Sequence, residues 1–159
     1  MSIKNYLLKD QGPLRPDNAV AAIIKNPSND YLLQLRDLIN GIFYPGHWGL
    51  FGGGLEKKDI DPKDCVIREL KEELNISFNR EQVVEFTNFT FDFSFSNRGI
   101  LSRTYFEIEI NQDQMENIIL GEGSDYGFFE IEEILLNKKV VPYDLYALWL
   151  YSSKARFKN

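Results

Sequence analysis

The chain has 159 residues, 43% of them hydrophobic and 14% aromatic, which is enough for one domain with a core of its own. Its 18 basic and 24 acidic residues give a formal charge of -6, which disfavours sequence-independent binding to long nucleic acids because phosphate neutralisation supplies most of that affinity. A single cysteine, Cys65, excludes an internal disulfide framework and a cysteine metal cluster, and it fits a reducing cytoplasm. Residues 1–10 hold no long apolar run, and no later stretch reaches the roughly 18 apolar residues of a membrane span. We therefore expect one cytoplasmic domain over residues 1–159, with no secretory signal and no membrane segment.

The first elements predicted are a hairpin and a long loop. Residues 19–24 (AVAAII) favour a short apolar strand, residues 26–30 a turn, and residues 31–36 (YLLQLR) a second strand. Residues 37–54 are too rich in glycine for a regular element and too aromatic for a linker. Loops of this kind often carry function.

A helix is predicted over residues 62–74. Asp61 suits the N-cap, Pro62 the first helical position, and Asp64 the positive end of the helix. Asn75 is the commonest non-glycine residue for the left-handed conformation that closes a helix. Both ends of this helix are therefore specified locally.

The remainder of the chain predicts two long strands and a terminal helix. Residues 82–95 and 100–110 alternate in the manner of strands, and residues 96–99 are expected to join them. An acidic, glycine-bearing loop at 121–127 and a short segment at 128–136 follow. The last helix is predicted over residues 142–155, with its apolar side formed by Leu145, Leu148 and Trp149.

The helix at 62–74 carries two different faces. At about 100° per residue, one arc is apolar and an adjacent arc holds Glu69, Glu72 and Glu73. Like charges at this spacing cost roughly 0.2 to 0.5 kcal/mol per pair, so the cluster gains if a hard cation binds beside the glycine-rich loop. The helix alone favours a plainer interpretation, in which the glutamates are solvated and Arg68 or Lys71 pairs with them locally. A triple glycine, taken alone, is also more often a turn than a phosphate site.

Together, the glycines and the glutamates resemble a known motif. Residues 53–76 (GGLEKKDIDPKDCVIRELKEELNI) are similar to the Nudix box, which reads glycine, five residues, glutamate, seven residues, then Arg-Glu-apolar-any-Glu-Glu-any-Gly-apolar. Residues 68–76 match the second half at every fixed position except one. Residues 31–36 and 48–53 also look like the family's approach to its box. The resemblance implies an α/β fold, a Nudix-type α/β/α sandwich with a mixed central sheet.

Three positions depart from the family pattern. Asp59 stands where the first glutamate is expected, and eight residues rather than seven separate it from Arg68. Asn75 replaces the box glycine, which its tolerance of the left-handed conformation explains. Phe51 replaces a proline often seen before the paired glycines. No helix carboxylate is lost, so we expect activity to survive.

The resemblance also implies a metal site. Carried over to this chain, the family's ligands are the Gly52 carbonyl and the carboxylates of Glu69, Glu72 and Glu73, holding Mg²⁺, or Mn²⁺ in its place. Arg68 would orient the glutamates. A metal held there neutralises charge on phosphoryl oxygens and lowers the pKa of a bound water, which attacks one phosphorus in line.

The group that accepts the proton is less defined by the motif, because family members use either a box glutamate or a glutamate from a later loop. Glu122 is the candidate for a supplementary ligand or base, and a solvated loop acid is an equally good interpretation. His47 is the only histidine, and without a second nitrogen or sulfur ligand it is interpreted as a loop residue near the entrance rather than a catalytic one.

Substrate contacts are assigned to residues outside the box. Arg36 and Arg103 are candidates for phosphate binding, and Tyr44, Trp48 and Phe51 for stacking on a base. Core packing explains each aromatic residue at least as well.

The function implied is Mg²⁺-dependent hydrolysis of a diphosphate bond in a small nucleotide. We expect a nucleoside triphosphate or a nucleotide sugar, with ADP-ribose a further option, and release of a nucleoside monophosphate or a sugar phosphate. The alternatives are a catalytically silent Nudix-like module that binds a nucleotide or a protein, and a purely structural acidic domain. The presence of all three metal-site glutamates argues against a catalytically silent module, because binding alone would not require so many aligned acids. The aromatic residues of 86–95 could supply a homodimer surface or a core.

Overall fold

The computed structural model describes residues 12–157, so the expectation about a secretory signal in residues 1–10 lies outside the described residues. Six strands form one sheet in the order β3-β2-β1-β5-β4, with β6 paired to β2. Strands β1 and β5 are parallel and the other pairs are antiparallel, so the sheet is mixed as predicted. The strands are β1 (Ala19–Lys25), β2 (Tyr31–Leu35), β3 (Trp48–Gly49), β4 (Val84–Asp92), β5 (Ile100–Glu109) and β6 (Asp125–Phe129).

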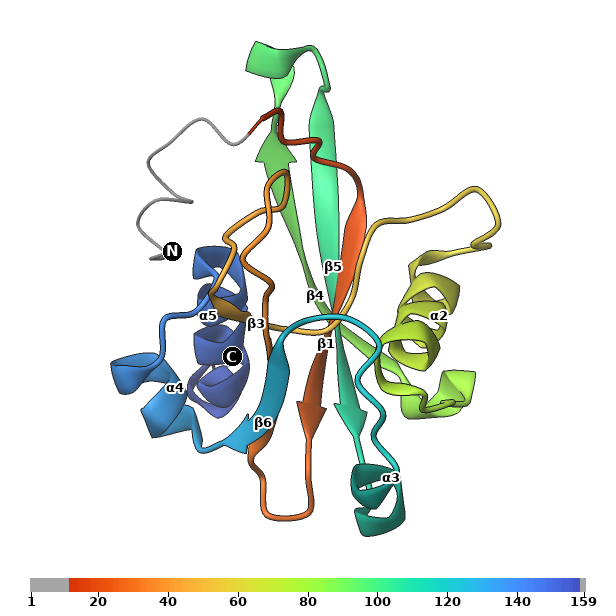
Figure 1. Cartoon of the computed structure of the whole chain (residues 1–159), viewed down its shortest axis with the longest axis vertical. Helices are drawn as coiled ribbons and strands as arrows, with labels where there is room; N and C mark the ends of the chain where they lie inside the picture. Colours follow the sequence, from red (N-terminus) through yellow and green to blue (C-terminus); the bar gives the residue numbers. More distant parts are fainter. Residues whose placement is uncertain (1–11, 158–159) are drawn as a thin grey trace.

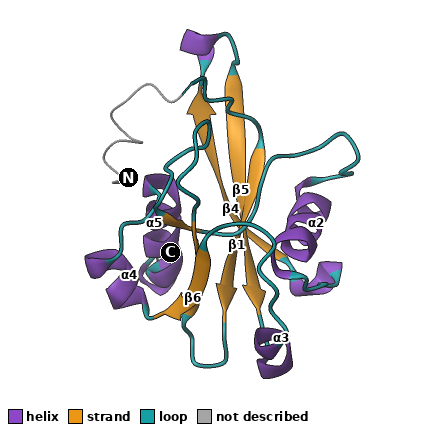
Figure 2. Ribbon diagram, in the orientation of Figure 1, coloured by secondary structure: helices purple, strands orange, loops and turns teal. Residues whose placement is uncertain are grey.

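Helices cover both faces of the sheet, which confirms the predicted α/β/α arrangement (Figures 1 and 2). Helix α2 lies on one side, and α4 and α5 lie on the other. The helices are α2 (Pro62–Leu74), α3 (Gln112–Glu116), α4 (Ile131–Asn137) and α5 (Pro142–Ser152), and short 3₁₀ turns occupy Arg80–Gln82, Ser94–Ser96 and Lys154–Arg156. Among the described residues, none of the helices has the length and apolarity needed to span a bilayer.

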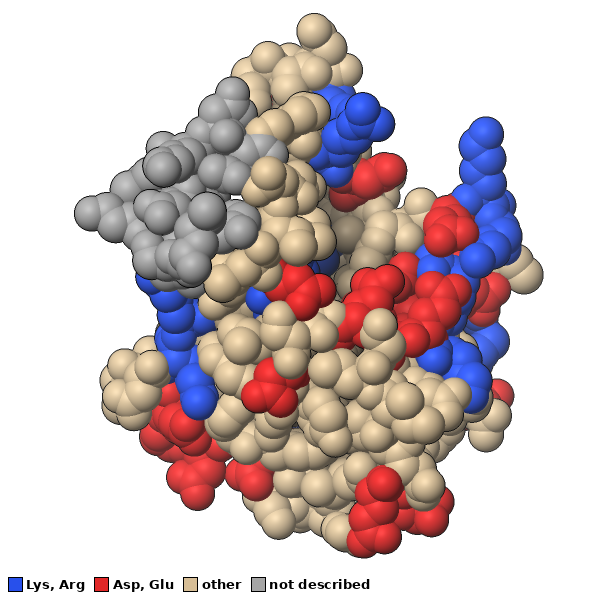
Figure 3. Space-filling view, viewed as in Figure 1, with Lys and Arg blue, Asp and Glu red and all other residues tan. Residues whose placement is uncertain are grey.

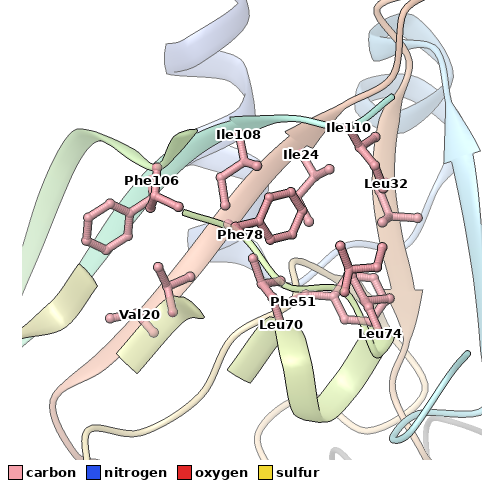
Figure 4. Close-up of a cluster of buried hydrophobic side chains, with 14 of the residues drawn as sticks. Val20, Ile24, Leu32, Phe51, Leu70, Leu74, Phe78, Phe106, Ile108 and Ile110 are labelled. Atoms are coloured by element: carbon pink, nitrogen blue, oxygen red, sulfur yellow. The ribbon is translucent and has the colours of Figure 1, made fainter. Parts of the chain in front are cut away.

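The hydrophobic core has two parts because β1 is buried on both faces. Its residues alternate between the two, as expected for a continuous apolar run in the centre of a sheet. Val20, Ala22 and Ile24 pack towards α2, together with Leu70 and Leu74 of that helix, as Figure 4 shows for several of these side chains. The other face packs against α5.

Strands β3 and β6 and helix α3 are among the short elements of the described chain that were not predicted. Strand β3 lies within the loop at 37–54, β6 begins inside the acidic loop at 121–127, and α3 follows β5. Turn-forming residues dominate the sequence around β3 and β6, whereas α3 is a short helix of five residues. Strand β6 forms because it pairs with β2 along its whole length, from Tyr31 opposite Phe129 to Leu35 opposite Asp125. This pairing is a long-range contact that local patterns do not contain.

The terminal helix differs from its prediction in two ways. It ends at Ser152 instead of 155, and Trp149 is 39% exposed rather than on the buried side. The buried residues are Asp144, Ala147, Leu148 and Tyr151. Apolar side chains occur all round this helix, so its sequence did not define one apolar stripe; Trp149 stacks on the exposed Tyr146, with centroids 5.9 Å apart.

The aromatic strand β4 serves several purposes. Phe86 and Phe89 pack against the α5-side core, and Phe91 and Phe93 line a pocket. Phe95, beyond the end of the strand, is exposed. The homodimer surface suggested for this strand stays a prediction.

Candidate active site

Helix α2 has the ends that its sequence predicts. The side chain of Asp61 accepts a hydrogen bond from the Asp64 N–H at 2.8 Å, Pro62 occupies the first turn, and Asn75 closes the helix with φ 58°. Lys71 donates to Asn75 Oδ1 at 2.8 Å, which helps to hold this left-handed residue. The register of the helix is therefore fixed at both ends, and with it the direction of the three glutamates.

The triple glycine is an extended strip that runs along β1, not a turn. The carbonyls of Phe51 and Gly53 accept hydrogen bonds from the N–H groups of Ala22 and Val20, each at 2.9 Å. Gly52 has φ +141°, and a Cβ there would lie 2.2 Å from the Val20 carbonyl oxygen. Only glycine fits a backbone this close to its neighbour. Among the hydrogen bonds of the described residues, none ends on the Gly52 carbonyl.

The strip lies against two of the box glutamates. A Cβ on Gly53 would lie 2.6 to 2.8 Å from the carboxylate atoms of Glu69. The Gly52 N–H donates to Glu73 Oε2 at 2.9 Å. The glycines therefore give carboxylates of α2 direct access to the backbone of residues 52 and 53.

Glu73 is a buried carboxyl group with 3% of its surface exposed. Burial raises the pKa of Glu73 to about 8, the charges of Glu69 and Glu122 add to the increase, and the Gly52 hydrogen bond opposes it. Gln34 of β2 places its Nε2 3.5 Å from Glu73 Oε1 and 3.3 Å from the Leu50 carbonyl. A negative charge at Glu73 is therefore unfavourable here until a cation approaches.

The other two glutamates, Glu69 and Glu72, form ion pairs with basic side chains. Glu69 Oε1 accepts from Arg68 Nη1 at 2.8 Å, and burial raises the pKa of Glu69 although this arginine opposes the change. Glu72 is exposed and lies 3.2 Å from Arg68 Nη1 and 3.8 Å from Lys58 Nζ. Local charge pairing, the plainer interpretation of the sequence, thus occurs together with the glutamate cluster.

Asp59 takes the position expected for the first acid of the box. Its two oxygens accept hydrogen bonds from Arg68 Nε and Nη2, each at 2.9 Å, and its side chain is 3% exposed. The Arg68 hydrogen bonds lower the pKa of Asp59 well below its usual range. Arg68 Nη2 also donates to the Gly54 carbonyl at 3.2 Å. A shorter acid with one extra loop residue therefore still meets the arginine, which ties the loop to the glycine strip and to α2.

The loop carrying Glu122 packs on the end of α2. The Gly121 N–H donates to the Glu73 carbonyl at 2.7 Å, and a Cβ on Gly121 would lie 2.3 Å from the Glu72 carbonyl oxygen. Glu122 and Glu73 line the same pocket, and the charge of Glu122 raises the pKa values of Glu69 and Glu73. The later-loop candidate is thus brought to the box glutamates. Figure 3 shows Asp and Glu side chains gathered in the middle of this face, beside a hollow.

The side chains at this site are not preassembled around a cation. In residues 12–157, no group of three or more His, Cys, Asp or Glu side chains is arranged to hold a metal ion. The groups available are oxygen donors, which are the ligands that Mg²⁺ prefers. The chemistry of the donors fits the metal, and Glu72 would have to leave its ion pairs to join the others.

A pocket of about 850 Å³ extends from the glutamates over the sheet. One end holds the glycine strip, Glu73 and the loop of Glu122. The rest is lined mainly by aromatic, aliphatic and arginine side chains, including Arg15, Arg36, Ile42, Phe43, Tyr44, Phe91, Phe93, Leu101, Arg103 and Tyr143. The volume lies within the usual range for small-molecule sites of roughly 300 to 1,000 Å³.

Three residues assigned from the sequence lie elsewhere. Phe51 is fully buried between the sheet and α2, beside Leu70 and Leu74 (Figure 4), so its ring cannot stack on a ligand. Trp48 does not line the pocket and packs edge-on against Phe129, with centroids 4.9 Å apart. His47 is buried, with Nδ1 3.2 Å from the Pro45 carbonyl, instead of lying at an entrance, and burial lowers its pKa. Arg36, Arg103 and Tyr44 do line the pocket.

The sequence did not identify Gln34 and Asp144 as residues of the pocket. Gln34 is a polar residue among the apolar neighbours of β2, and this exception to the strand pattern was a signal for a buried polar contact. Asp144 lies in the first turn of α5, where an acidic residue is common because it complements the helix dipole, so its position gives no sign of a buried contact. It is instead 2% exposed and pairs with Arg103 of β5, a contact that no local pattern reveals.

Structures with the same fold come from several organisms. The MutT protein from Methanosarcina mazei Go1 is 22% identical with a TM-score of 0.65, and the alignment covers 92% of this chain and 100% of that one. The NUDIX domain of Shewanella oneidensis NrtR, complexed with ADP ribose, is 16% identical with a TM-score of 0.69, covering 98% and 99%. A C. elegans Ap4A hydrolase binary complex is 20% identical with a TM-score of 0.63, covering 87% and 98%. At these identities the likeness establishes the fold.

The sequence itself defines the family. Residues 15–149 match the NUDIX domain, and no curated protein matches significantly. The chain therefore belongs to the Nudix family, whose members are mostly pyrophosphohydrolases that typically use a divalent metal.

Proposed function

We propose that this protein hydrolyses a diphosphate bond in a small nucleoside diphosphate derivative, using Mg²⁺ or Mn²⁺. The observation that carries this proposal is the contact of Glu69 and Glu73 with the glycine strip at one end of an 850 Å³ pocket. Family membership supports this reaction class, because Nudix proteins are mostly pyrophosphohydrolases. The pocket supplies the space for a nucleotide beside the carboxylates.

The metal would be held by Glu69, Glu72, Glu73 and the Gly52 carbonyl. Two observations support this assignment: the Gly52 carbonyl accepts no hydrogen bond from residues 12–157, and the pKa values of Glu69 and Glu73 are raised, so a cation would relieve the repulsion between the carboxylates. When bound, the metal supplies charge neutralisation at the phosphoryl oxygens and a more acidic water.

The chain's own groups then have distinct roles. Arg68 holds Asp59, the Gly54 carbonyl and Glu69 together and so orients the glutamates. The carboxylate of Glu122 accepts the proton of the attacking water, a role supported by its place on the same pocket wall as Glu73. Arg36 binds a phosphate: its Nε is held by the Phe43 carbonyl at 2.8 Å, and its side chain lines the pocket.

The substrate proposed is a nucleoside triphosphate or a nucleotide sugar, with ADP-ribose as a third class. Similar structures support the breadth of this choice, since they include a domain complexed with ADP ribose, an Ap4A hydrolase and a dihydroneopterin triphosphate pyrophosphohydrolase. The products would be a nucleoside monophosphate with diphosphate, or with a sugar phosphate. The net charge of -6 keeps long nucleic acid out of the proposal.

The test is product release from a panel of nucleoside triphosphates, nucleotide sugars and ADP-ribose, with Mg²⁺ and with a chelator. Glu72→Gln and Glu73→Gln proteins are compared with Glu116→Gln, which alters an exposed glutamate of α3. We expect metal-dependent turnover of one class, lost by at least about 100-fold in the two site variants and unchanged in the control.

A nucleotide-binding module without catalysis is the second candidate. The observation favouring it is that Glu72 is tied to Arg68 and Lys58 and no three-carboxylate site is preassembled. Equilibrium binding of a nucleotide together with Mg²⁺, and no turnover of any member of the panel, would establish this function instead.

A further inference from the structure

Arg103 lies on β5, an internal strand of the sheet, and its side chain lines the same pocket as Glu73 and Glu122. It faces Ala19 of β1 and Phe89 of β4 in the strand register, and its side chain is only 16% exposed. Its Nε lies 3.2 Å from Asp144 Oδ1 and its Nη2 3.5 Å from Oδ2. The guanidinium is therefore fixed by an ion pair and lines the pocket.

Asp144 is fully engaged and offers little to a ligand. Besides Arg103, its oxygens accept hydrogen bonds from the Leu50 N–H and the Tyr105 hydroxyl, each at 3.0 Å. Its side chain is 2% exposed. The Arg103–Asp144 pair therefore presents the donor groups of the arginine to the pocket rather than the acceptors of the carboxylate.

Aromatic rings surround the same guanidinium. Its central carbon lies 5.1 Å from the centroid of Tyr143 and 5.5 Å from that of Tyr105. The Tyr143 ring in turn meets the edges of Tyr44 and Phe91, with centroids 5.9 and 6.1 Å apart. Tyr44, Phe91 and Tyr143 all line the pocket, so aromatic surface on which a flat ring can pack lies beside Arg103.

The net charge around Arg103 affects which kind of ligand this side chain can bind. Asp144 offsets the charge of Arg103, which weakens the attraction for a phosphate and leaves a directional set of N–H groups. Nη1 takes no part in the ion pair, and Nη2 has a second hydrogen besides the one directed at Asp144, so the Nη1–Nη2 edge still offers two N–H donors. An arginine fork matches two adjacent acceptors on a ring, as it does with O6 and N7 of guanine, whereas adenine presents a donor beside its N7.

We propose that Arg103, held by Asp144, reads the O6/N7 edge of a guanine-type base, and that this protein prefers guanine over adenine nucleotides. The inference rests on the proposed function, since it places the diphosphate at the acidic end of the same pocket. It assigns Arg103 to the base and leaves the phosphates to Arg36.

The test measures binding by isothermal titration calorimetry of GMP, IMP, AMP and 7-deaza-GMP in the presence of Mg²⁺. Monophosphates contain no diphosphate bond, so binding is measured without turnover. GMP and IMP, which share both acceptors, should bind about five- to 150-fold more tightly than AMP, the range that one bidentate contact supplies. 7-Deaza-GMP, which lacks the N7 acceptor, should bind more weakly than GMP.

Arg103→Lys supplies the matching variant, because it keeps a positive charge opposite Asp144 and loses the planar fork. It should remain folded, as thermal unfolding would verify, and should bind GMP and AMP equally. Arg156→Lys, the same change at an exposed residue outside the pocket, should keep the preference. Equal binding of GMP and AMP by the natural protein, undiminished binding of 7-deaza-GMP, no binding of GMP, or a preference that survives in Arg103→Lys would each overturn the assignment. A guanine preference without diphosphate hydrolysis would instead refute only the proposed function.

Discussion

Replacing Asp59 with asparagine should destabilise the protein at neutral pH and leave Arg68 without its main partner. Two hydrogen bonds of 2.9 Å join these side chains, which are 3% and 14% exposed. Removing one partner of a buried ion pair costs about 3 to 5 kcal/mol. Asparagine keeps one acceptor, so we expect a loss of about 3 kcal/mol in the free energy of unfolding, or a decrease of about 6 to 12 °C in Tm.

The pH dependence of this difference is the more demanding part of the prediction. Because the pKa of Asp59 is lowered in the folded protein, its contribution is complete above its ordinary pKa of 3.8 and is lost as the pH falls below that value. Urea unfolding of both proteins at pH 7, 4 and 3 should therefore show a constant difference down to about pH 4 and a smaller one at pH 3. Asp125→Asn, at an exposed position of β6, is the control and should change little. A loss below 1 kcal/mol at pH 7, or a difference that grows in acid, would refute the reasoning.

Two further predictions concern backbone positions. Asn75→Ala should lower the free energy of unfolding by about 1 to 2 kcal/mol in thermal denaturation, because a φ of 58° is unfavourable for a side chain that cannot form local hydrogen bonds. Asn75→Gly should cost less, because glycine adopts this conformation freely. Equal losses in the two variants would contradict this prediction. Gly53→Ala should reduce turnover and leave the fold intact, because the new Cβ would lie 2.6 to 2.8 Å from the Glu69 carboxylate atoms. Gly54→Ala is the matched control, since the atom nearest to its Cβ would be 3.9 Å away. Unchanged kcat in Gly53→Ala, or equal losses in the two variants, would show that the strip does not set the position of Glu69.

The features that the sequence predicted well are local. Asp61, Pro62 and Asn75 act through groups within a turn of themselves, so the ends of α2 could be inferred from residue type alone. The apolar run of β1 and the alternation in β5 likewise specify strands. The box spacing was informative because a helix places residues 69, 72 and 73 on one side whatever surrounds it.

What escaped prediction depends on contacts between distant segments. Burial brings Phe51 into the core beside residues of α2, the Gln34 contact with Glu73 joins residues 39 positions apart, and the pairing of Arg103 with Asp144 joins residues 41 positions apart. The strand β6 exists through its pairing with β2. The type of a residue limits which contacts it can make, and the packing of the whole chain determines which of them form.

The inserted residue before α2 illustrates both cases. The sequence showed the departure at Asp59, and the geometry shows how it is accommodated, with the shorter acid and the longer loop meeting the same arginine. The spacing alone could not show whether the longer loop keeps the contact between the acid and Arg68 or loses it.

The most direct test of the central claim is ³¹P NMR of the best substrate of the panel, incubated with the natural protein and with Glu72→Gln. We expect new monophosphate resonances only when Mg²⁺ and Glu72 are both present, and we expect the variant to fold as the natural protein does. Cleavage that continues in a chelator, or at the natural rate in Glu72→Gln, would contradict the claim that these carboxylates and a metal break the diphosphate bond.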